Sequence, residues 1–303
     1  MKIGLIDVDG HNFPNLPLMK ISAHHKRKGD QVEWLNMFDK YDIVYQSKVF
    51  THTEDFEYIP QTDELLKGGT GYNLKKNLPS ITESMTPDYS LYPELTKNTA
   101  YGFLTRGCPR NCPFCIVTEK EGQCAYKVAD LDQFWTGQKE IEILDPNLLA
   151  CKDRIELLDQ LIESKAKINI NQGMDARFLN DEVIDKIAQL KLKMVHFAWD
   201  MLTDTDQLIQ DNIKKFIEVT KFGFRKIRVY VLTNYNTTHE QDLYRIYKLK
   251  EIGTDPYVMI YEKETALKQT KRVARWVNNK FIFRACEKFE DYSTVHNKYN
   301  NEV

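Results

Sequence analysis

The sequence has neither a long apolar run nor a strong net charge. No stretch of its 303 residues approaches the roughly 20 consecutive apolar residues that a membrane-spanning helix needs. Lysine and arginine number 42 and aspartate and glutamate 44, so the formal net charge is −2 and no overall basic field attracts nucleic acid. Residues 1–6 lead into Asp7 and lack the apolar core of a secretion signal. We therefore expect a cytoplasmic protein without a membrane segment, and the charge implies no nucleic-acid partner.

Cysteine is also scarce, with six in the chain. Because a reducing cytosol disfavours disulfides, these cysteines are expected to be metal ligands and buried thiols. Cys124, Cys151 and Cys286 lie too far apart in the sequence to support a second metal site, and we expect them to be buried thiols. Cys124 follows the other three closely, so a thiol that takes part in the chemistry is the alternative at that position.

The other three cysteines, Cys108, Cys112 and Cys115, form a C-x3-C-x2-C motif directly after the strand-like apolar run 100–104. Three thiolates on one short loop can hold three irons of a [4Fe–4S] cluster and leave the fourth iron open for a small molecule. The same three cysteines could instead bind zinc, with a distant histidine as the fourth ligand, in an interaction module. The motif therefore predicts a metal centre, and a cluster with an open iron is the favoured interpretation.

The spacing, with Phe114 directly before the last cysteine, resembles the signature of the radical S-adenosylmethionine (SAM) superfamily. In that superfamily the amino and carboxylate groups of SAM bind the open iron. The reduced cluster cleaves SAM to methionine and a 5′-deoxyadenosyl radical, which abstracts a hydrogen atom from the substrate. The resemblance implies an enzyme with a [4Fe–4S] cluster and SAM, and with an electron donor such as a flavodoxin or ferredoxin. It also implies that the backbone at Phe114 approaches adenine. An iron–sulfur protein that has lost SAM cleavage is the second interpretation.

From residue 100 onward, strand-like and helix-like patterns alternate. Helical stripes occur between the strands, for example Ile155, Leu158 and Ile162. Alternation of this kind predicts an α/β fold with a parallel sheet and right-handed crossovers. The resemblance sharpens the prediction to a partial (β/α)6 barrel. The six strand candidates are residues 101–104, 141–144, 168–170, 194–199, 227–232 and 257–261.

Before this barrel, the sequence predicts a small, open α/β N-terminal domain at residues 1–60 and a connecting segment at 61–99, and residues 60–99 hold four prolines. The partial barrel then covers 100–290, and 291–303 form a polar tail.

The order Asp9-Gly10-His11 resembles the Asp-x-His-x-x-Gly signature of cobalamin-binding domains. Here the glycine position of that signature is Pro14, and a segment of 60 residues is short for a full cobalamin pocket. The resemblance therefore implies a truncated, cobalamin-binding-like domain, and a working cobalamin site is the less favoured interpretation.

Polar residues follow the second strand candidate in the sequence Asp145-Pro146-Asn147. In parallel α/β barrels, the loops after the strands converge on one face, so site residues are expected there. The superfamily commonly places a polar motif at this point to bind the amino group of SAM, although the common Gly-Gly-Glu form is absent here. The resemblance implies that Asp145 and Asn147 contact SAM. An acidic turn before the following helix is the alternative.

Further polar residues follow the third, fourth and fifth strand candidates. The stretch 172–177 resembles a Gln-Gly-x-Asp-Ala-Arg-like segment of radical SAM proteins. Because a guanidinium can pair with a carboxylate through two parallel bonds, we expect Arg177 to bind the SAM carboxylate, oriented by Asp175 or Gln172. A structural salt bridge between Asp175 and Arg177 is the alternative. Asp200 and Asn234 are candidates for the ribose hydroxyls and the adenine edge.

Overall fold

The computed structural model describes residues 1–10 and 12–293. His11 of the cobalamin-like motif and residues 294–303 of the predicted tail therefore lie outside the described residues. Contacts divide the chain into two compact units, Met1–Asn169 and Ile170–Val303. Each unit is described by itself below.

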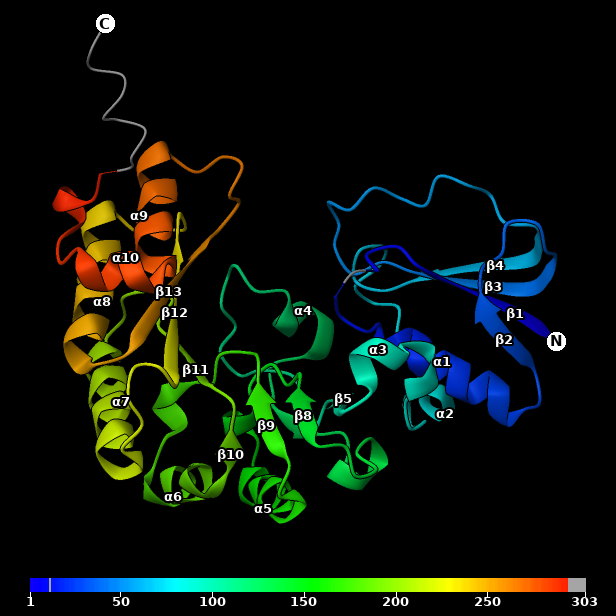
Figure 1. The fold of residues 1–303 in the computed structure, drawn as a ribbon, viewed down its shortest axis with the longest axis horizontal. Helices are drawn as coiled ribbons and strands as arrows, with labels where there is room; N and C mark the ends of the chain where they lie inside the picture. Colours follow the sequence, from blue (N-terminus) through cyan, green and yellow to red (C-terminus); the bar gives the residue numbers. More distant parts are fainter. Residues whose placement is uncertain (11, 294–303) are drawn as a thin grey trace, which may run out of the picture. The chain divides into compact units, whose positions relative to one another are not determined.

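The first unit begins with a four-stranded parallel sheet in the order β2-β1-β3-β4. Its first helix, α1, follows β1, and Ile3, Leu18 and Met19 form part of the core between that helix and the sheet (Figure 1). The Asn15 side chain accepts a hydrogen bond of 3.2 Å from the Leu18 N–H and caps the helix. The elements are β1 Lys2–Asp7, α1 Leu16–Arg27, β2 Gln31–Trp34, β3 Tyr41–Ser47, β4 Thr62–Gly68, α2 Ser80–Glu83, η1 Tyr89–Leu91 and α3 Pro93–Thr96.

Strand β4 lies within residues 61–99, where the sequence predicts only a connecting segment. It pairs in parallel with β3, with Val44 opposite Leu65. The strand forms the edge of the sheet, and none of its residues is buried, so it lacks the apolar alternation that marks a strand in a sequence. The first sheet thus extends beyond residue 60. The predicted domain boundaries at 60 and 99 remain a prediction.

The remainder of the first unit contains the strands that precede and follow the cysteine motif. Strands β5 and β8 pair in parallel, with Tyr101 opposite Glu142, and β9 lies on the other side of β8. The short antiparallel pair β6 and β7 encloses the cysteine loop and α4. The elements are β5 Thr99–Gly102, β6 Thr105–Arg106, α4 Val117–Glu121, β7 Tyr126–Lys127, η2 Leu131–Gln133, β8 Glu140–Ile143, η3 Leu148–Ala150, α5 Arg154–Ser164 and β9 Lys167–Ile170.

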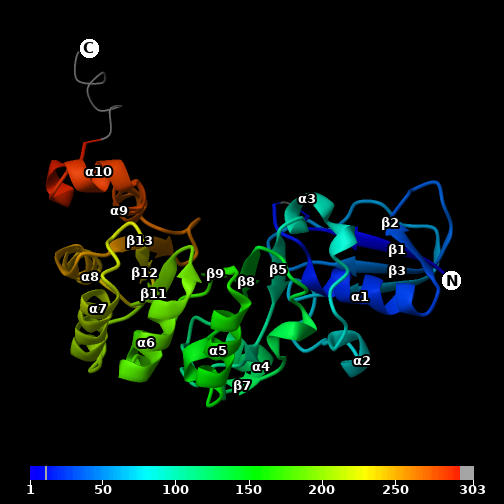
Figure 2. The same ribbon diagram turned by 60° about the horizontal axis from the view of Figure 1, so that its bottom comes forward.

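The second unit is built on a three-stranded parallel sheet in the order β11-β12-β13. Phe197, Val229 and Phe216 are fully buried, and Figures 1 and 2 show α7 and α8 along one face of this sheet. The elements are η4 Ala176–Phe178, α6 Asp181–Gln189, β10 Lys191–Leu192, β11 Val195–Ala198, α7 Asp206–Thr220, β12 Ile227–Thr233, α8 His239–Ile252, β13 Asp255–Ile260, α9 Lys268–Asn278, α10 Lys280–Ala285 and η5 Phe289–Asp291.

The predicted α/β fold with parallel sheets is confirmed. The six predicted strands correspond to β5, β8, β9, β11, β12 and β13, and the described strands form open sheets rather than a closed barrel. One predicted helical stripe is displaced, because α5 buries Leu157, Leu158 and Leu161 instead of Ile155 and Ile162. Among the described residues, no helix combines the length and the apolar character that crossing a membrane requires.

Candidate functional site

The cysteine loop is closed at its base by backbone contacts. Gly107 has a φ of +77°, and a Cβ atom at this position would collide with the carbonyl oxygen of Cys124. The Gly107 N–H donates to Glu121 Oε2 over 3.0 Å, and the Cys108 N–H donates to the carbonyl oxygen of Gly122 over 3.3 Å. Only glycine fits this conformation and this space without strain. The start of the loop is therefore held against the segment that follows α4.

Within the loop, the three cysteines keep some exposure. The Cys115 N–H donates to the carbonyl oxygen of Cys112 over 2.9 Å and forms a tight turn. Cys108 and Cys112 are half-buried, and Cys115 is exposed. Among residues 1–10 and 12–293, no three His, Cys, Asp or Glu side chains are grouped as they would be around a single metal ion. A [4Fe–4S] cluster does not need that grouping, because each cysteine binds a different iron.

Asn147 lies against the first cysteine. Its side chain is 4% exposed, and its Nδ2 donates a hydrogen bond to Cys108 Sγ over 3.5 Å. Its Oδ1 is buried and has no hydrogen-bond partner among the described residues. An N–H donor stabilises the negative charge of a thiolate, and hydrogen bonds to the sulfurs tune iron–sulfur clusters. The donor and the three thiols together fit a cluster at this loop.

Asp145, two residues before Asn147, holds the backbone ahead of the loop. Its side chain is 1% exposed. Oδ1 accepts from the Leu104 N–H over 2.8 Å, and Oδ2 accepts from the Thr105 N–H over 2.8 Å and from its hydroxyl over 2.6 Å. Burial raises the pKa of Asp145 to about 7, while the three donors oppose this shift. Asp145, which follows β8, thus ties the end of that strand to Leu104 and to the first residue of β6. Its predicted contact with the SAM amino group stays a prediction.

The other predicted residue of the first unit is Phe114, which is half-buried in the cysteine loop. Of the leftover cysteines, Cys151 is buried as predicted and Cys286 is half-buried. Cys124 is exposed, so its prediction as a buried thiol is wrong. Its carbonyl oxygen faces Gly107, which places it at the base of the cysteine loop.

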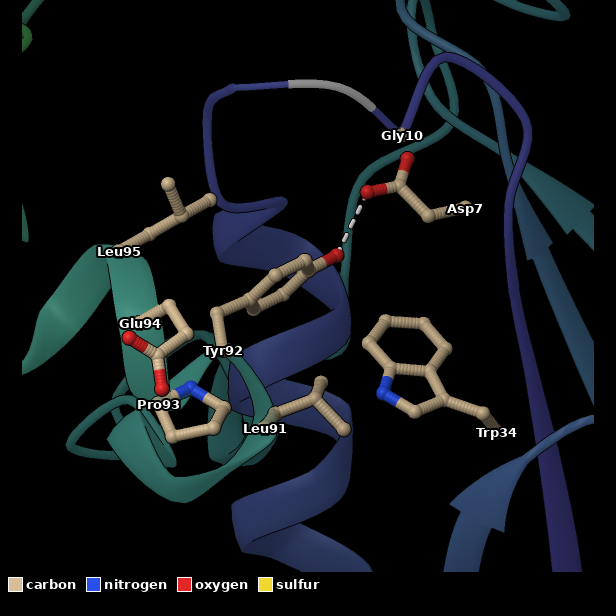
Figure 3. A pocket seen from close by; sticks show the side chains of 8 residues that line it. All are labelled: Asp7, Gly10, Trp34, Leu91, Tyr92, Pro93, Glu94 and Leu95. Atoms are coloured by element: carbon tan, nitrogen blue, oxygen red, sulfur yellow. Dashed lines mark hydrogen bonds between the residues drawn. The ribbon is translucent and has the colours of Figure 1, made fainter.

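The cobalamin-like motif follows β1. The Asp9 carboxylate accepts hydrogen bonds from the Val49 N–H and, over 2.6 Å, from the Thr53 hydroxyl, so it fastens the segment after β3. Beside it, a hollow of about 430 Å³ is lined by Asp7, Trp34 and Tyr92 among others. Figure 3 shows the Tyr92 hydroxyl donating to Asp7 Oδ2 over 2.6 Å.

In the second unit, Asp175 and Arg177 form the salt bridge that the sequence offers as an alternative. Asp175 is 6% exposed and caps η4, where Oδ1 accepts from the Arg177 N–H over 3.1 Å. The same oxygen accepts from Arg177 Nε over 2.6 Å. Gln172 is exposed on the preceding loop. The structure therefore brings Asp175 and Arg177 together, and the binding of the SAM carboxylate by Arg177 stays a prediction.

The sequence does not reveal Arg245, which organises the ends of β11 and β12. Its side chain is 0% exposed and forms an ion pair of 2.6 Å with Asp242. Nη1 donates to the carbonyl oxygens of Trp199 (2.8 Å) and Asp200, and Nη2 donates to that of Leu232 (2.8 Å). The available signal is a charged pair at i and i+3 on the otherwise apolar face of α8.

Asp200 and Asn234 follow these strands. Burial raises the pKa of the Asp200 carboxyl to about 6, and the charge of Arg245 opposes this shift. Asn234 has a φ of +65°, and its Nδ2 donates to the carbonyl oxygen of Tyr261 over 2.8 Å. Asn234 thus links the ends of β12 and β13. Both residues lie at strand ends as predicted, and their contacts with SAM stay predictions.

Comparison with known proteins rests on structure alone, because no protein-family model and no curated protein matches the sequence. One match is the radical SAM methyltransferase TsrM from Kitasatospora setae with cobalamin and a [4Fe–4S] cluster bound. It covers 86% of this chain and 74% of its own length at a TM-score of 0.61 and 10% identity. A second structure of the same enzyme, with tryptophan substrate and a SAM analogue bound, also matches. This alignment covers 85% of the present chain and 72% of TsrM, at a TM-score of 0.65 and 10% identity.

A third match, SuiB from Streptococcus suis bound to its precursor peptide, is more distant. It covers 63% of this chain and 46% of its own length at a TM-score of 0.43 and 15% identity. The match to TsrM shows that the chain has the fold of a radical SAM enzyme.

Proposed function

We propose that the protein is a radical SAM enzyme in which Cys108, Cys112 and Cys115 each bind one iron of a [4Fe–4S] cluster. The observation that carries the proposal is the glycine-closed loop of three cysteines with the buried Asn147 amide on Cys108, within a radical SAM enzyme fold. When bound and reduced, such a cluster supplies the electron that cleaves SAM to methionine and a 5′-deoxyadenosyl radical.

The residues of the first unit would hold and shape the cluster site. Asn147 would stabilise the thiolate of Cys108 through its N–H donor. Asp145 would fix the backbone at Leu104 and Thr105, so that the loop begins from a rigid base. Asp145 is a positioning residue in this proposal, because both of its oxygens already accept hydrogen bonds from the chain.

The residues of the second unit would bind SAM by its polar groups. Arg177 would pair with the SAM carboxylate, and Asp175 would hold the guanidinium in place through Nε. Asp200 and Asn234 would bind the ribose hydroxyls or the adenine edge from the ends of β11 and β12. The reducing electron would come from a flavodoxin or ferredoxin, as in the superfamily that the motif resembles.

The test is formation of 5′-deoxyadenosine by anaerobically reconstituted protein supplied with SAM and a strong reductant. The wild type should form it, and a Cys112→Ala variant should not. Cys286→Ala is the matched control, because Cys286 lies far from the loop in the sequence and is half-buried. Retention of full activity by the Cys112→Ala variant would remove Cys112 from the ligands.

Two alternatives give different results. An iron–sulfur protein without SAM cleavage would be brown and would hold about four irons per chain, yet would form no 5′-deoxyadenosine. A zinc-binding interaction module would be colourless and redox-silent, because Zn²⁺ has a filled d shell.

Cobalamin is a second candidate cofactor, because TsrM, which has the same fold, binds it in the solved structure. Two features of this chain oppose it. Pro14 occupies the glycine position of the resembling motif, and the Asp9 carboxylate is engaged by Val49 and Thr53. Incubation with hydroxocobalamin followed by gel filtration tests the point, and a corrin spectrum that elutes with the protein would show binding.

A further inference from the structure

A large cavity lies within the first unit, beside the cysteine loop. Its volume is about 1240 Å³, and its walls come from α1, from the ends of β3 and β4, from residues 76–87 and from both flanks of the loop. Phe103 and Arg106 line it ahead of the cysteines, and Lys120 and Tyr126 line it after them. Pockets for small ligands usually measure about 300–1,000 Å³, so this cavity has room for a sizeable organic molecule.

The charged groups of this cavity are predominantly positive. Its lining holds six lysine or arginine residues and three aspartate or glutamate residues. Three of the cations form ion pairs, since Lys20 pairs with Glu83 over 2.7 Å, Lys67 pairs with Asp55 over 2.8 Å, and Arg106 pairs with Glu121 over 2.7 Å. The lining residues are Lys20, Lys28, Lys67, Lys76, Arg106 and Lys120, with Asp30, Glu83 and Glu121.

Lys120 differs from these paired cations. It is half-buried on α4, and among the described residues its Nζ forms no ion pair and donates to the Thr70 hydroxyl over 2.8 Å. Burial lowers the pKa of Lys120, which an anion beside it would oppose. An ammonium group has three N–H donors, so one hydrogen bond to Thr70 does not exhaust its capacity.

The turn that carries Thr70 is held tightly. Gly69 has a φ of +94°, and a Cβ atom there would collide with the carbonyl oxygen of Lys48. The Gly71 N–H donates to the same oxygen over 2.9 Å. The hydroxyl of Thr70 and the ammonium of Lys120 therefore form a fixed polar corner of a cavity to which Leu66, Phe103 and Leu144 also contribute apolar side chains.

We propose that this cavity binds an organic anion, with its carboxylate, phosphate or sulfonate group on Lys120 and Thr70 and its apolar body along the remaining wall. A half-buried cation held by a neutral hydroxyl gains a charge-assisted hydrogen bond from such a ligand. The apolar walls supply burial for the rest of the molecule.

The position of the cavity beside the cysteine loop assigns this ligand as the substrate, a step that rests on the function proposed above. Binding of the anion itself does not rest on it. The experiment therefore measures binding alone, in the full-length protein without added iron, SAM or reductant. If no anion binds, the proposal of SAM cleavage is unaffected. If the protein does not cleave SAM, the result of the binding experiment still stands.

The probes are 2-naphthoate and its neutral analogue 2-naphthamide, which share one ring system and differ in charge, with 2-naphthyl phosphate as a second anion. Calorimetry should show that at least one anion binds the wild type about tenfold or more tightly than the amide, because a charge-assisted hydrogen bond is lost with the amide. If neither anion binds more tightly than the amide, or if neither anion binds at all, the proposal is overturned. This comparison needs no variant.

The Lys120→Met variant tests whether Lys120 binds the anionic group. It should lose the preference for the anion, whereas Lys120→Arg should keep it. Lys214→Met is the matched control, because Lys214 is an exposed helical lysine outside the cavity, and it should behave as the wild type. A Lys120→Met variant that melts at the wild-type temperature and still prefers the anion would overturn the assignment to Lys120.

Discussion

Asn147 Nδ2 donates a hydrogen bond to Cys108 Sγ over 3.5 Å, from a side chain that is 4% exposed. The donor comes from the segment after β8 and the acceptor from the loop after β6, so two strand ends meet at one sulfur. Buried polar side chains are rarely placed without a partner, and here the partner is one of the three predicted cluster ligands. The contact thus links the cysteine motif to the segment that follows β8.

Replacing Asn147 with leucine should leave three cysteines and therefore an iron content of about four per chain. The reduction potential of the cluster should fall, because loss of the N–H donor removes stabilisation of the added negative charge, on the order of 1 kcal/mol. A potentiometric titration followed by electron paramagnetic resonance measures this shift. Asn180→Ala, which removes a helix cap in the second unit, is the control and should leave the potential unchanged. An unchanged potential in Asn147→Leu would place this amide away from the cluster.

Replacing Arg177 with methionine should weaken SAM binding by about tenfold or more, since a charge-assisted pair with the carboxylate is lost. Iron content should stay the same, because no cluster ligand changes. Equilibrium binding of SAM to the reconstituted protein measures the effect. Arg225→Met is a matched control at an exposed position. Equal SAM affinity in Arg177→Met and wild type would leave Arg177 with only its salt bridge to Asp175.

Replacing Arg245 with methionine should lower the free energy of unfolding by about 3–5 kcal/mol, because the change leaves Asp242 buried without its cation. The carbonyl oxygens of Trp199 and Leu232 also lose their donor. Lysine should not restore the loss, since it cannot reach several acceptors with a planar fork. Urea unfolding measures this quantity, with Arg225→Met as the exposed control. A loss below about 1 kcal/mol would contradict the role of Arg245 in joining the strand ends.

The raised pKa of Asp200 predicts that the free energy of unfolding depends on pH. Its folded pKa of about 6 lies above the ordinary value of 3.8, so folding takes up a proton between these two values. The contribution of Asp200 to stability therefore falls as the pH rises from about 4 to about 6, by at most about 3 kcal/mol. Asp200→Asn removes this dependence, so the variant should gain stability relative to the wild type across that range. Urea unfolding at a series of pH values measures the difference, and parallel curves would contradict the raised pKa.

Much of the fold could be predicted from apolar patterns. The six central strands follow from short apolar runs, because each is buried in a parallel sheet. Strand β4 could not be predicted, since it is an edge strand without buried residues. The buried face of α5 differs by one to two positions from the stripe that the sequence predicts. The reason is that the helix offers two overlapping apolar stripes, formed by Ile155, Leu157, Leu158, Leu161 and Ile162.

In the candidate site, too, local features could be predicted from the sequence, and contacts between distant residues could not. The cysteine motif is local, so its spacing alone indicates the chemistry. The partner of Asn147 and the acceptors of Arg245 are far away in the sequence, and no local pattern encodes them. The hydrogen bonds from Leu104 and Thr105 to Asp145 are likewise distant in the sequence and could not be predicted, while the contact of Asp145 with SAM stays a prediction.

The central claim is that three cysteines hold a cluster whose fourth iron accepts SAM. Electron paramagnetic resonance of the reconstituted, reduced protein with and without SAM tests it most directly. We predict about four irons per chain and a signal that changes on addition of SAM, because the open iron gains ligands. A full cluster whose signal is indifferent to SAM, or a colourless protein that holds zinc on the same cysteines, would contradict the account.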